Sequence, residues 1–404
     1  MLVKGAIPSK EPIVKIGLVL PDDQKKSIEV VDLNTNDQYT IDISFDGKRL
    51  SASEYQLSSI RAGRGFHWEK EIRITIEGEL DIKVINGYLF VTNYIPLEKY
   101  LVCVATSEMS GDCPSALLKA QTIAARSWLL AAAEQKHANI GLDACNDDCC
   151  QRYQGKENIT DEALRAAKNS RGKVVLFDDE ICDTRYSKSC GGMSEHNENV
   201  WQGNPKPYLR GVFDSPESLN PDLSSEMGLS NWIHKPSRCF CDSHFVPIDQ
   251  LKDYLGQVDE LKNYFRWHIT YSQNELAQLI SKKTGQSFDS ITALQPINRG
   301  ISGRITNLRI KGEKKDNPVS IQLNSEYEIR RVLHPEFLYS SAFIIEINST
   351  LNTHLAQLTL HGAGWGHGVG LCQIGALGMS LNGKSTQEIL SHYFKSTELR
   401  KIYD

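Results

Sequence analysis

Glu108 has the sequence setting of a carboxyl group that can hold a proton. It follows Leu97, Leu101 and Val104 at helical spacing, so a helix here would point its side chain toward the same side as these apolar residues. Burial among apolar groups disfavours the carboxylate and raises the pKa of the acid, which then keeps its proton near neutral pH. Such an acid can protonate a glycosidic oxygen. The alternative is a structural glutamate that caps the helix end or pairs with Arg126.

A second carboxyl group at a spacing that would pair with Glu108 is not evident. Asp112 is close in sequence, but we expect it to lie in the turn after the helix. Most glycosidases use two carboxyl groups, because a hydrolase needs a base that activates water. A lytic transglycosylase uses the sugar's own C6 hydroxyl group and can work with one carboxyl group, so a single acid favours that reaction.

A cluster of thiol and imidazole side chains is the second candidate for chemistry. Its members are His137, Cys145, Cys149 and Cys150. Thiolates and an imidazole suit Zn²⁺, which favours sulfur and nitrogen ligands in a tetrahedral arrangement. We expect such a zinc ion to be structural, because Glu108 already supplies an acid. The alternative is a disulfide, or buried thiols, in a secreted protein.

Other cysteines form weaker patterns. Cys239 and Cys241 could form a second metal site with His244, or either could bridge to Cys182 or Cys190. So short a cluster in a loop is a weak metal motif. Cys372 lies beside the predicted start of a helix, where we expect it to pack in the core.

The elements that would position these residues begin with β-structure. Residues 13–95 have the character of strands, with alternating apolar residues at 72, 74 and 76, and Asn86-Gly87 supplies a hairpin turn. Pro96 then begins a helix, and a second, rich in alanine and leucine, begins near Pro114.

The rest of the chain mixes both kinds of element. Capping boxes at Ser272 and Ser385 begin two helices. The further predictions are a helix at 161–170, a hairpin at 172–186, strands at 265–271, 301–311, 342–347 and 356–361, a helix from 371 to 382, a turn at 311–315, and irregular structure at 214–250. Together these predict an α+β fold, with mixed helices and mainly antiparallel strands and a β-rich N-terminal portion.

The composition is that of an ordinary globular protein. The chain has 404 residues and a formal net charge of −5. Its isoelectric point near 6.2 argues against a protein that binds nucleic acid by neutralising phosphates. No apolar run reaches the length of a membrane span. The first residues contain no uninterrupted apolar segment, so we expect a signal peptide to be absent from this chain or to have been removed.

Four sequence blocks occur in an order that identifies a family resemblance. They are "YIPLEKYLVCVATSEMSGDCPSALLKAQTIAARSWLLA" (94–131), "CQRYQG" (150–155), "RYSKSCGGMSE" (185–195) and "GWGHGVGLCQIGALGMSLNGKSTQEILSHYF" (364–394). In these blocks the chain resembles the stage II sporulation protein D family and its amidase-enhancer relatives. Four ordered motifs are a much stronger indication than any one of them.

The resemblance implies an activity and a set of site residues. The sporulation member of the family is a lytic transglycosylase that cleaves peptidoglycan glycan strands between N-acetylmuramic acid and N-acetylglucosamine, and its catalytic glutamate falls on Glu108. The residues that the resemblance marks as contacting or supporting the glycan are Lys119, Gln121, Arg126, Tyr186, Ser187 and Lys188. For Arg126 a structural ion pair is the equal alternative, and for Tyr186 a place in the core.

The resemblance also bears on the metal, the domains and the location. Some members hold zinc at the positions of Cys145 and Cys150, but here Cys149 stands where we expect a histidine, so His137 and Cys149 both qualify as the third ligand. We expect a β-rich portion at 1–90 and a catalytic core at 91–404, with an irregular insertion at about 214–290. The implied location is the bacterial cell envelope.

A glycine-rich stretch, "HGAGWGHGVGLCQIGA" (361–376), has a glycine at every second position from Gly362 to Gly370. Glycine marks backbone that bends unusually or approaches another group closely. The stretch lacks the spacing of a zinc protease and of a phosphate-binding loop. We expect it to form the floor of a glycan cleft, in which His367 and Gln373 hydrogen-bond substrate or support Glu108. A packing role, in which the glycines let two elements touch, is the alternative.

Two hypotheses of function follow from the sequence. The first is a lytic transglycosylase with Glu108 as general acid and base, and an intact "SEM" around Glu108 favours it. The second is a non-catalytic peptidoglycan-binding module that stimulates an N-acetylmuramoyl-L-alanine amidase. A zinc hydrolase is a third possibility.

Overall fold

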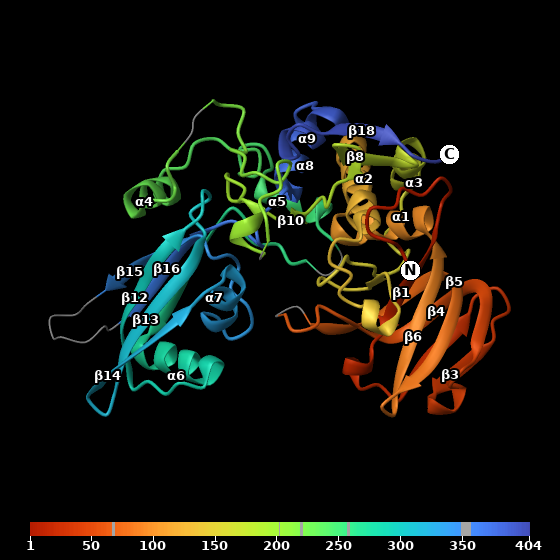
Figure 1. Cartoon of the computed structure of the whole chain (residues 1–404), viewed down its shortest axis with the longest axis horizontal. Helices are drawn as coiled ribbons and strands as arrows, with labels where there is room; N and C mark the ends of the chain where they lie inside the picture. Colours follow the sequence, from red (N-terminus) through yellow and green to blue (C-terminus); the bar gives the residue numbers. More distant parts are fainter. Residues whose placement is uncertain (67–68, 202, 219–220, 257–258, 349–356) are drawn as a thin grey trace. The chain divides into compact units, whose positions relative to one another are not determined.

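The computed structural model of the chain describes residues 1–66, 69–201, 203–218, 221–256, 259–348 and 357–404 (Figure 1). In these residues helices are mixed with mainly antiparallel strands, which confirms the predicted α+β class and its β-rich N-terminal portion. The chain forms two compact units. Unit 1 comprises Met1–Thr184, Leu251–Leu261 and Thr397–Asp404, and unit 2 comprises Arg185–Gln250 and Lys262–Ser396. The division at residue 90 that the sequence suggests stays a prediction.

Unit 1 is built on a seven-stranded sheet with the order β3-β2-β4-β5-β6-β1-β7. Its strands are β1 (Ile13–Val19), β2 (Ser27–Asp32), β3 (Gln38–Asp42), β4 (Arg49–Ala62), β5 (Lys70–Ile85), β6 (Tyr88–Pro96) and β7 (Ala144–Cys145). The long strands pair antiparallel, and β1 pairs with β7 in parallel. The predicted turn at Asn86-Gly87 joins β5 to β6, with φ values of 51° and 79° that a two-residue hairpin requires.

The helices of unit 1 lie at one end of this sheet (Figure 1). They are α1 (Leu97–Glu108), α2 (Ser115–Ala131) and α3 (Asp161–Ser170). Pro96 and Pro114 immediately precede α1 and α2, which confirms both helix starts. α2 packs against α1, α3 and β8 (Lys173–Phe177). β8 in turn pairs with β9 (Glu180–Ile181) and with the C-terminal strand β18 (Glu398–Lys401). α1, whose last residue is Glu108, packs against α2 and α3.

Unit 2 contains two three-stranded antiparallel sheets. One has the order β11-β16-β15, and the other the order β12-β13-β14. Their bounds are β11 (Arg266–Ser272), β15 (Phe343–Asn348), β16 (Gln357–Ala363), β12 (Ser290–Arg299), β13 (Ile305–Lys314) and β14 (Asn317–Leu323). These strands share a core of apolar residues between positions 267 and 360 with the helices α6 (Gln273–Thr284) and α7 (Glu326–Val332). The predicted capping box at Ser272 begins α6.

The remaining elements of unit 2 are short. A parallel pair joins β10 (Tyr186–Ser187) to β17 (Leu371–Cys372). The helices are α4 (Glu226–His234), α8 (Gln373–Leu381) and α9 (Thr386–Tyr393), and α5 (Ile248–Leu251) ends where the chain passes into unit 1. Ser385 caps α9 as predicted. No helix in the described part of the chain is long and apolar enough to cross a membrane.

Several sequence predictions of elements were wrong or incomplete. β12, β14 and α7 were not predicted, and α4 lies in the stretch expected to be irregular. The turn expected at 311–315 lies at Lys315 and Asp316, which have φ values of 49° and 60°. The charged residues before it belong to β13, whose pairing with β14 continues to Lys314. The strand predicted at 356–361 is β16, and residue 356 lies outside the described residues.

Candidate functional site

Glu108 is buried at the C-terminal end of α1. Its side chain is 7% exposed, and the Arg152 N–H donates a hydrogen bond of 3.1 Å to its Oε1 atom. The two residues that follow Glu108 are fixed by contacts with a segment that is distant in sequence. Met109 forms a β-bridge with Leu255, and the Ser110 N–H donates to the Tyr254 carbonyl at 3.0 Å. The position of the carboxyl group is therefore set by α1 and by two segments that are distant in sequence.

The Arg152 side chain makes the surroundings of Glu108 more polar than the sequence led us to expect. Its guanidinium donates hydrogen bonds of 2.7 Å to Asp148 and to Asp259. Burial opposes the charged form of Arg152, but the negative charges of Asp148, Asp259 and Glu108 raise its pKa above the ordinary value. Glu108 therefore lies beside a permanent cation as well as among apolar residues. The two aspartates near it are both engaged by that cation.

The segment 151–154 lines the end of α1 and contains a residue that sequence reasoning missed. The Gln154 N–H donates to Ser107 Oγ at 3.1 Å, which places Gln154 next to the helix end. Its side chain is 2% exposed, and neither atom of its amide has a hydrogen-bond partner among the described residues. A buried amide in this state is usually satisfied by water or a ligand. Gln154 belongs to the block "CQRYQG", which is the sequence signal that points to it.

The predicted thiol and imidazole cluster is assembled in unit 1. The donor atoms of His137, Cys145, Cys149 and Cys150 all lie within 4.8 Å of one another. Cys149 Sγ is 3.0 Å from Cys145 Sγ and 3.5 Å from His137 Nε2, so both candidates for the third ligand are in place. Hydrogen bonds from the Cys145 and Cys150 thiols, and from His137, hold the pKa of Cys149 far below its usual value. This donor set fits a four-coordinate structural zinc ion.

Tyr100 connects this cluster with Glu108. Burial raises the pKa of Tyr100, and negative charge on Cys150, Cys145 and Glu108 raises it further. Its hydroxyl group donates to Gln151 Oε1 at 3.1 Å. The acid and the cluster thus share one neighbourhood in unit 1, with the segment that follows the cysteines between them.

The predicted residues of α2 have different environments. Arg126 is fully buried and forms two hydrogen bonds with Glu98, of 2.9 and 2.6 Å. This is the structural ion pair that the sequence left as an alternative, and it places the guanidinium out of reach of a ligand in solution. Gln121 is also fully buried, whereas Lys119 is half-buried.

The other predicted residues belong to unit 2 and lie near one another. Tyr186 and Ser187 form β10 beside β17, and the Lys188 carbonyl accepts from Ile374 N–H at 3.0 Å. Gln373 is the first residue of α8 and is 1% exposed. Ser187 is also buried, and its Oγ has no hydrogen-bond partner among the described residues. The structure thus brings these residues together as one set, in a different unit from Glu108.

His367 supports the glycine-rich stretch. Its Nδ1 accepts a hydrogen bond from Val369 N–H at 3.0 Å, so the neutral ring carries its proton on Nε2. Burial, followed by the charges of three arginines, lowers its pKa well below the ordinary value of 6.5; the arginines are Arg185, Arg330 and Arg304. The ring packs against Trp201 with centroids 4.8 Å apart. His367 is therefore a neutral, structurally engaged imidazole.

The glycines of this stretch make room for protein atoms. A Cβ atom at Gly368 would lie 2.3 Å from the Arg304 guanidinium carbon, and one at Gly370 would lie 2.1 Å from the Arg185 carbonyl oxygen. Both residues also have φ of 74°, which other residues rarely adopt. The packing role, which was the alternative in the sequence analysis, accounts for these two positions.

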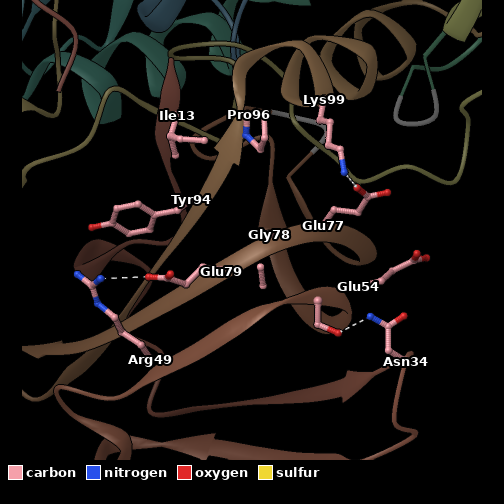
Figure 2. Close-up of a pocket in the computed structure, with 12 residues that line it drawn as sticks. Ile13, Asn34, Arg49, Glu54, Glu77, Gly78, Glu79, Tyr94, Pro96 and Lys99 are labelled. Carbon is pink, nitrogen blue, oxygen red and sulfur yellow. Dashed lines mark hydrogen bonds and ion pairs between the residues drawn. The ribbon is translucent and has the colours of Figure 1, made fainter. Parts of the chain in front are cut away.

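A hollow of about 610 Å³ lies on the sheet of unit 1 (Figure 2). Its lining carries charges that pair with one another, as Lys99 does with Glu77 and Arg49 with Glu79. None of the residues predicted to act on or bind a glycan lines it. We assign it no role in the chemistry.

Two family models match two different parts of the chain. Residues 86–177 match a family model described as stage II sporulation protein. This segment includes Glu108 and the thiol and imidazole cluster. The chain carries a stage II sporulation protein domain. Residues 195–370 match a second family model, described only as a domain of unknown function (DUF8618).

Sequence similarity to known proteins extends over most of the chain. An uncharacterized protein of Brachyspira hyodysenteriae is 26% identical over 327 residues, which are 80% of this chain and 71% of that protein. Stage II sporulation protein D of Bacillus amyloliquefaciens is 22% identical over 76% of this chain and 74% of its own length. The amidase enhancer of Bacillus subtilis is 23% identical over 73% of this chain, but the match covers only 39% of the enhancer.

Proposed function

We propose that this protein is a lytic transglycosylase that cleaves the glycan strands of peptidoglycan in the bacterial cell envelope, with Glu108 as its general acid and base. The observation that carries the proposal is the buried Glu108 carboxyl group at the end of α1, held by the Arg152 N–H inside the stage II sporulation protein domain. Helical spacing and the family resemblance both point to the same residue.

The proposed reaction needs one carboxyl group and no water. Protonated Glu108 gives its proton to the oxygen between N-acetylmuramic acid and N-acetylglucosamine, and the bond from that oxygen to C1 breaks. The C6 hydroxyl oxygen of the same muramic acid then bonds to C1, and its proton returns to the Glu108 carboxylate. The product is a 1,6-anhydro ring, and the enzyme is restored. Arg152 would stabilise the carboxylate form that exists between the two proton transfers, because its charge lies beside Glu108.

We further propose that His137, Cys145, Cys149 and Cys150 hold a structural zinc ion. Their donor atoms are close enough to share one ion, and they offer only sulfur and nitrogen. Bound there, zinc would supply a cross-link that fixes the segment leading to Arg152 and Gln154. The chemistry assigned to Glu108 does not pass through the metal.

The competing function is a non-catalytic one. The amidase enhancer of Bacillus subtilis is among the relatives, and its match covers 73% of this chain. On this alternative the protein binds peptidoglycan and stimulates an N-acetylmuramoyl-L-alanine amidase, and Glu108 has no role in bond cleavage.

The experiment is mass spectrometry of purified glycan strands after incubation with the protein. We expect fragments that end in 1,6-anhydro-muramic acid, and we expect Glu108→Gln to reduce their rate of formation by about 10²- to 10⁴-fold, the usual contribution of a general acid. The matched control is Asp112→Asn, because Asp112 is an exposed carboxylate in the turn after α1. It should leave the rate unchanged.

Two results would contradict the proposal. Intact strands that bind the protein without being cut would support the amidase-enhancer function. Fragments with ordinary reducing ends, lost on treatment with a chelator, would indicate a zinc hydrolase.

A further inference from the structure

A second group of potential metal ligands lies in unit 2, outside the site described above. It consists of Cys190, Asp214, Cys241 and Cys372, and their donor atoms all lie within 4.8 Å of one another. All four side chains are buried, with 0–4% of their surface exposed. They come from four segments that are far apart in sequence: the residues after β10, two loops, and the end of β17.

The distances within this group match a mononuclear tetrahedral site. Zn–S bonds of about 2.3 Å and Zn–O bonds of about 2.0 Å place two thiolates about 3.8 Å apart, and a thiolate and a carboxylate oxygen about 3.5 Å apart. Cys190 Sγ is 3.7 Å from Cys241 Sγ and 3.3 Å from Asp214 Oδ2. A disulfide would require about 2.05 Å between sulfur atoms. An iron–sulfur cluster could not keep all four protein donors within 4.8 Å of one another, because the atoms of the cluster lie between donors on different irons.

Asp214 is oriented so that one carboxylate oxygen faces the thiols. Its Oδ1 atom accepts a hydrogen bond of 2.8 Å from the Tyr393 hydroxyl group and lies 3.3 Å from His392 Nε2. Oδ2 points toward Cys190 and the start of α8, where a Cβ atom on Gly375 would lie only 2.2 Å away. Outer hydrogen bonds of this kind orient metal-binding carboxylates.

Backbone N–H groups are directed at the sulfur atoms. Cys372 Sγ accepts hydrogen bonds of 3.2 Å from the N–H groups of Cys190 and Gly375, the second of which lies in the first turn of α8. The Gly192 N–H donates to Cys190 Sγ at 3.3 Å. Donors at a helix N-terminus stabilise a thiolate, which is the form that binds a metal.

Three thiols and a carboxylate thus converge in a buried space. A divalent cation would stabilise the ionised forms of these groups there.

We propose that Cys190, Asp214, Cys241 and Cys372 bind one zinc ion in a closed structural site. Four protein ligands leave no position for water, so the ion would be structural rather than catalytic. It would join the segments at 190–192, 214 and 241 to the start of α8. These segments contribute no residue to the apolar core between positions 267 and 360, so a metal cross-link would fix a part of unit 2 that this core does not reach.

The neighbouring Cys239 provides a matched control. It lies two residues from Cys241 in the same loop and is equally buried. Its Sγ lies 3.4 Å from the Ser237 carbonyl oxygen, and it does not belong to the group of four. Replacing Cys239 therefore removes a buried thiol without removing a proposed ligand.

The test is the zinc content of the purified full chain, measured by elemental analysis. A Cys145→Ser/Cys149→Ser background disables the first cluster, so that retained zinc reports on the second. We expect about one zinc ion per chain in this background, the same after adding Cys239→Ser, and almost none after adding Cys241→Ser. Equal zinc content in the parent and the background would count against zinc at the first cluster only, so the two proposals fail separately.

X-ray absorption at the zinc edge in the background variant avoids the question of whether Cys241→Ser folds. We expect a shell of three sulfur atoms and one oxygen atom. The proposal is overturned if the background chain, prepared with zinc, contains none, or if the shell has another composition. It is also overturned if mass spectrometry without reduction finds a disulfide among Cys190, Cys241 and Cys372.

Discussion

The Arg126 guanidinium and the Glu98 carboxylate form an ion pair inside unit 1. Glu98 also accepts hydrogen bonds from the Tyr403 hydroxyl group at 2.6 Å and from the Gly172 N–H at 3.3 Å. Burial alone would raise the pKa of Glu98, but the hydrogen bonds and charge of Arg126 keep it below the ordinary value. The pair therefore links α1 and α2 to the C-terminal segment.

Arg126→Ala should destabilise the protein rather than weaken substrate binding alone. It leaves the Glu98 carboxylate buried without its cation, which costs about 3–5 kcal/mol of unfolding free energy. The measurement is urea unfolding of the parent and the variant. The double variant Arg126→Met/Glu98→Gln should recover part of the loss, because no unpaired charge remains. Unchanged stability with weaker glycan binding would instead assign Arg126 to the substrate.

His367 makes the stability of the protein depend on pH. In the folded protein burial and neighbouring arginines keep its pKa well below 6.5, so the ring stays neutral. The unfolded chain takes up this proton as the pH falls below about 6.5. The unfolded state then binds more protons, so stability falls with decreasing pH, by up to about 1.4 kcal/mol per pH unit for this group.

The variant His367→Asn tests this prediction, because an asparagine oxygen can replace Nδ1 as the acceptor for Val369 N–H. Urea unfolding at several pH values between 4.5 and 7.5 should show a smaller pH dependence in the variant than in the parent. Equal slopes below pH 6.5 would mean that His367 is protonated as readily in the folded protein as in the unfolded chain.

At the scale of elements, the glycine-rich stretch is held close to the backbone of the segment that contains β10. Gly370→Ala would force a Cβ atom against the Arg185 carbonyl oxygen and would also strain a φ of 74°. Gly383→Ala is the matched control, since its φ is 78° but no atom lies within 4 Å of the added Cβ.

We expect the control to lose about 1–2 kcal/mol from backbone strain alone. Gly370→Ala should lose about 1–3 kcal/mol more, because overpacking adds to the strain. Urea midpoints of the two variants give the comparison. Equal losses would show that the stretch can move away from Arg185 at little cost, and the packing explanation would be wrong.

Elements with local signals were predictable from sequence. Asn86-Gly87 and the capping boxes at Ser272 and Ser385 were found because a turn or a helix start depends on a few adjacent residues. β12 was missed because Pro296 and Asn298 interrupt its apolar pattern, and it is a strand by virtue of pairing with β13. Tertiary pairing overrides local preference in such segments.

In the candidate sites, too, the sequence predicted what depends on local patterns and missed what depends on tertiary structure. Glu108 was predicted because its helical spacing is a local pattern. The cluster around Cys149 was predicted because three of its four members lie within six residues. Asp214 could not have been assigned to Cys190, Cys241 and Cys372, because only the fold of unit 2 brings these segments together. The close contact of Arg152 with Glu108 also depends on tertiary structure.

At the scale of the whole molecule, the two units are interleaved along the chain. Unit 1 contains the stage II sporulation protein domain. Two later segments, Leu251–Leu261 and Thr397–Asp404, also belong to unit 1. The first of these segments carries Asp259, which pairs with Arg152 beside Glu108. The contacts of the proposed acid described above therefore come from unit 1, from segments as far apart in sequence as α1 and Asp259.

The most direct test of the central claim is to run the reaction of the parent protein on glycan strands in ¹⁸O-labelled water. A mechanism that closes the ring with the C6 hydroxyl group uses no water, so the fragments should carry anhydro-muramic ends without the label. Label at newly formed reducing ends would show that water attacks C1, and it would contradict the role we assign to Glu108.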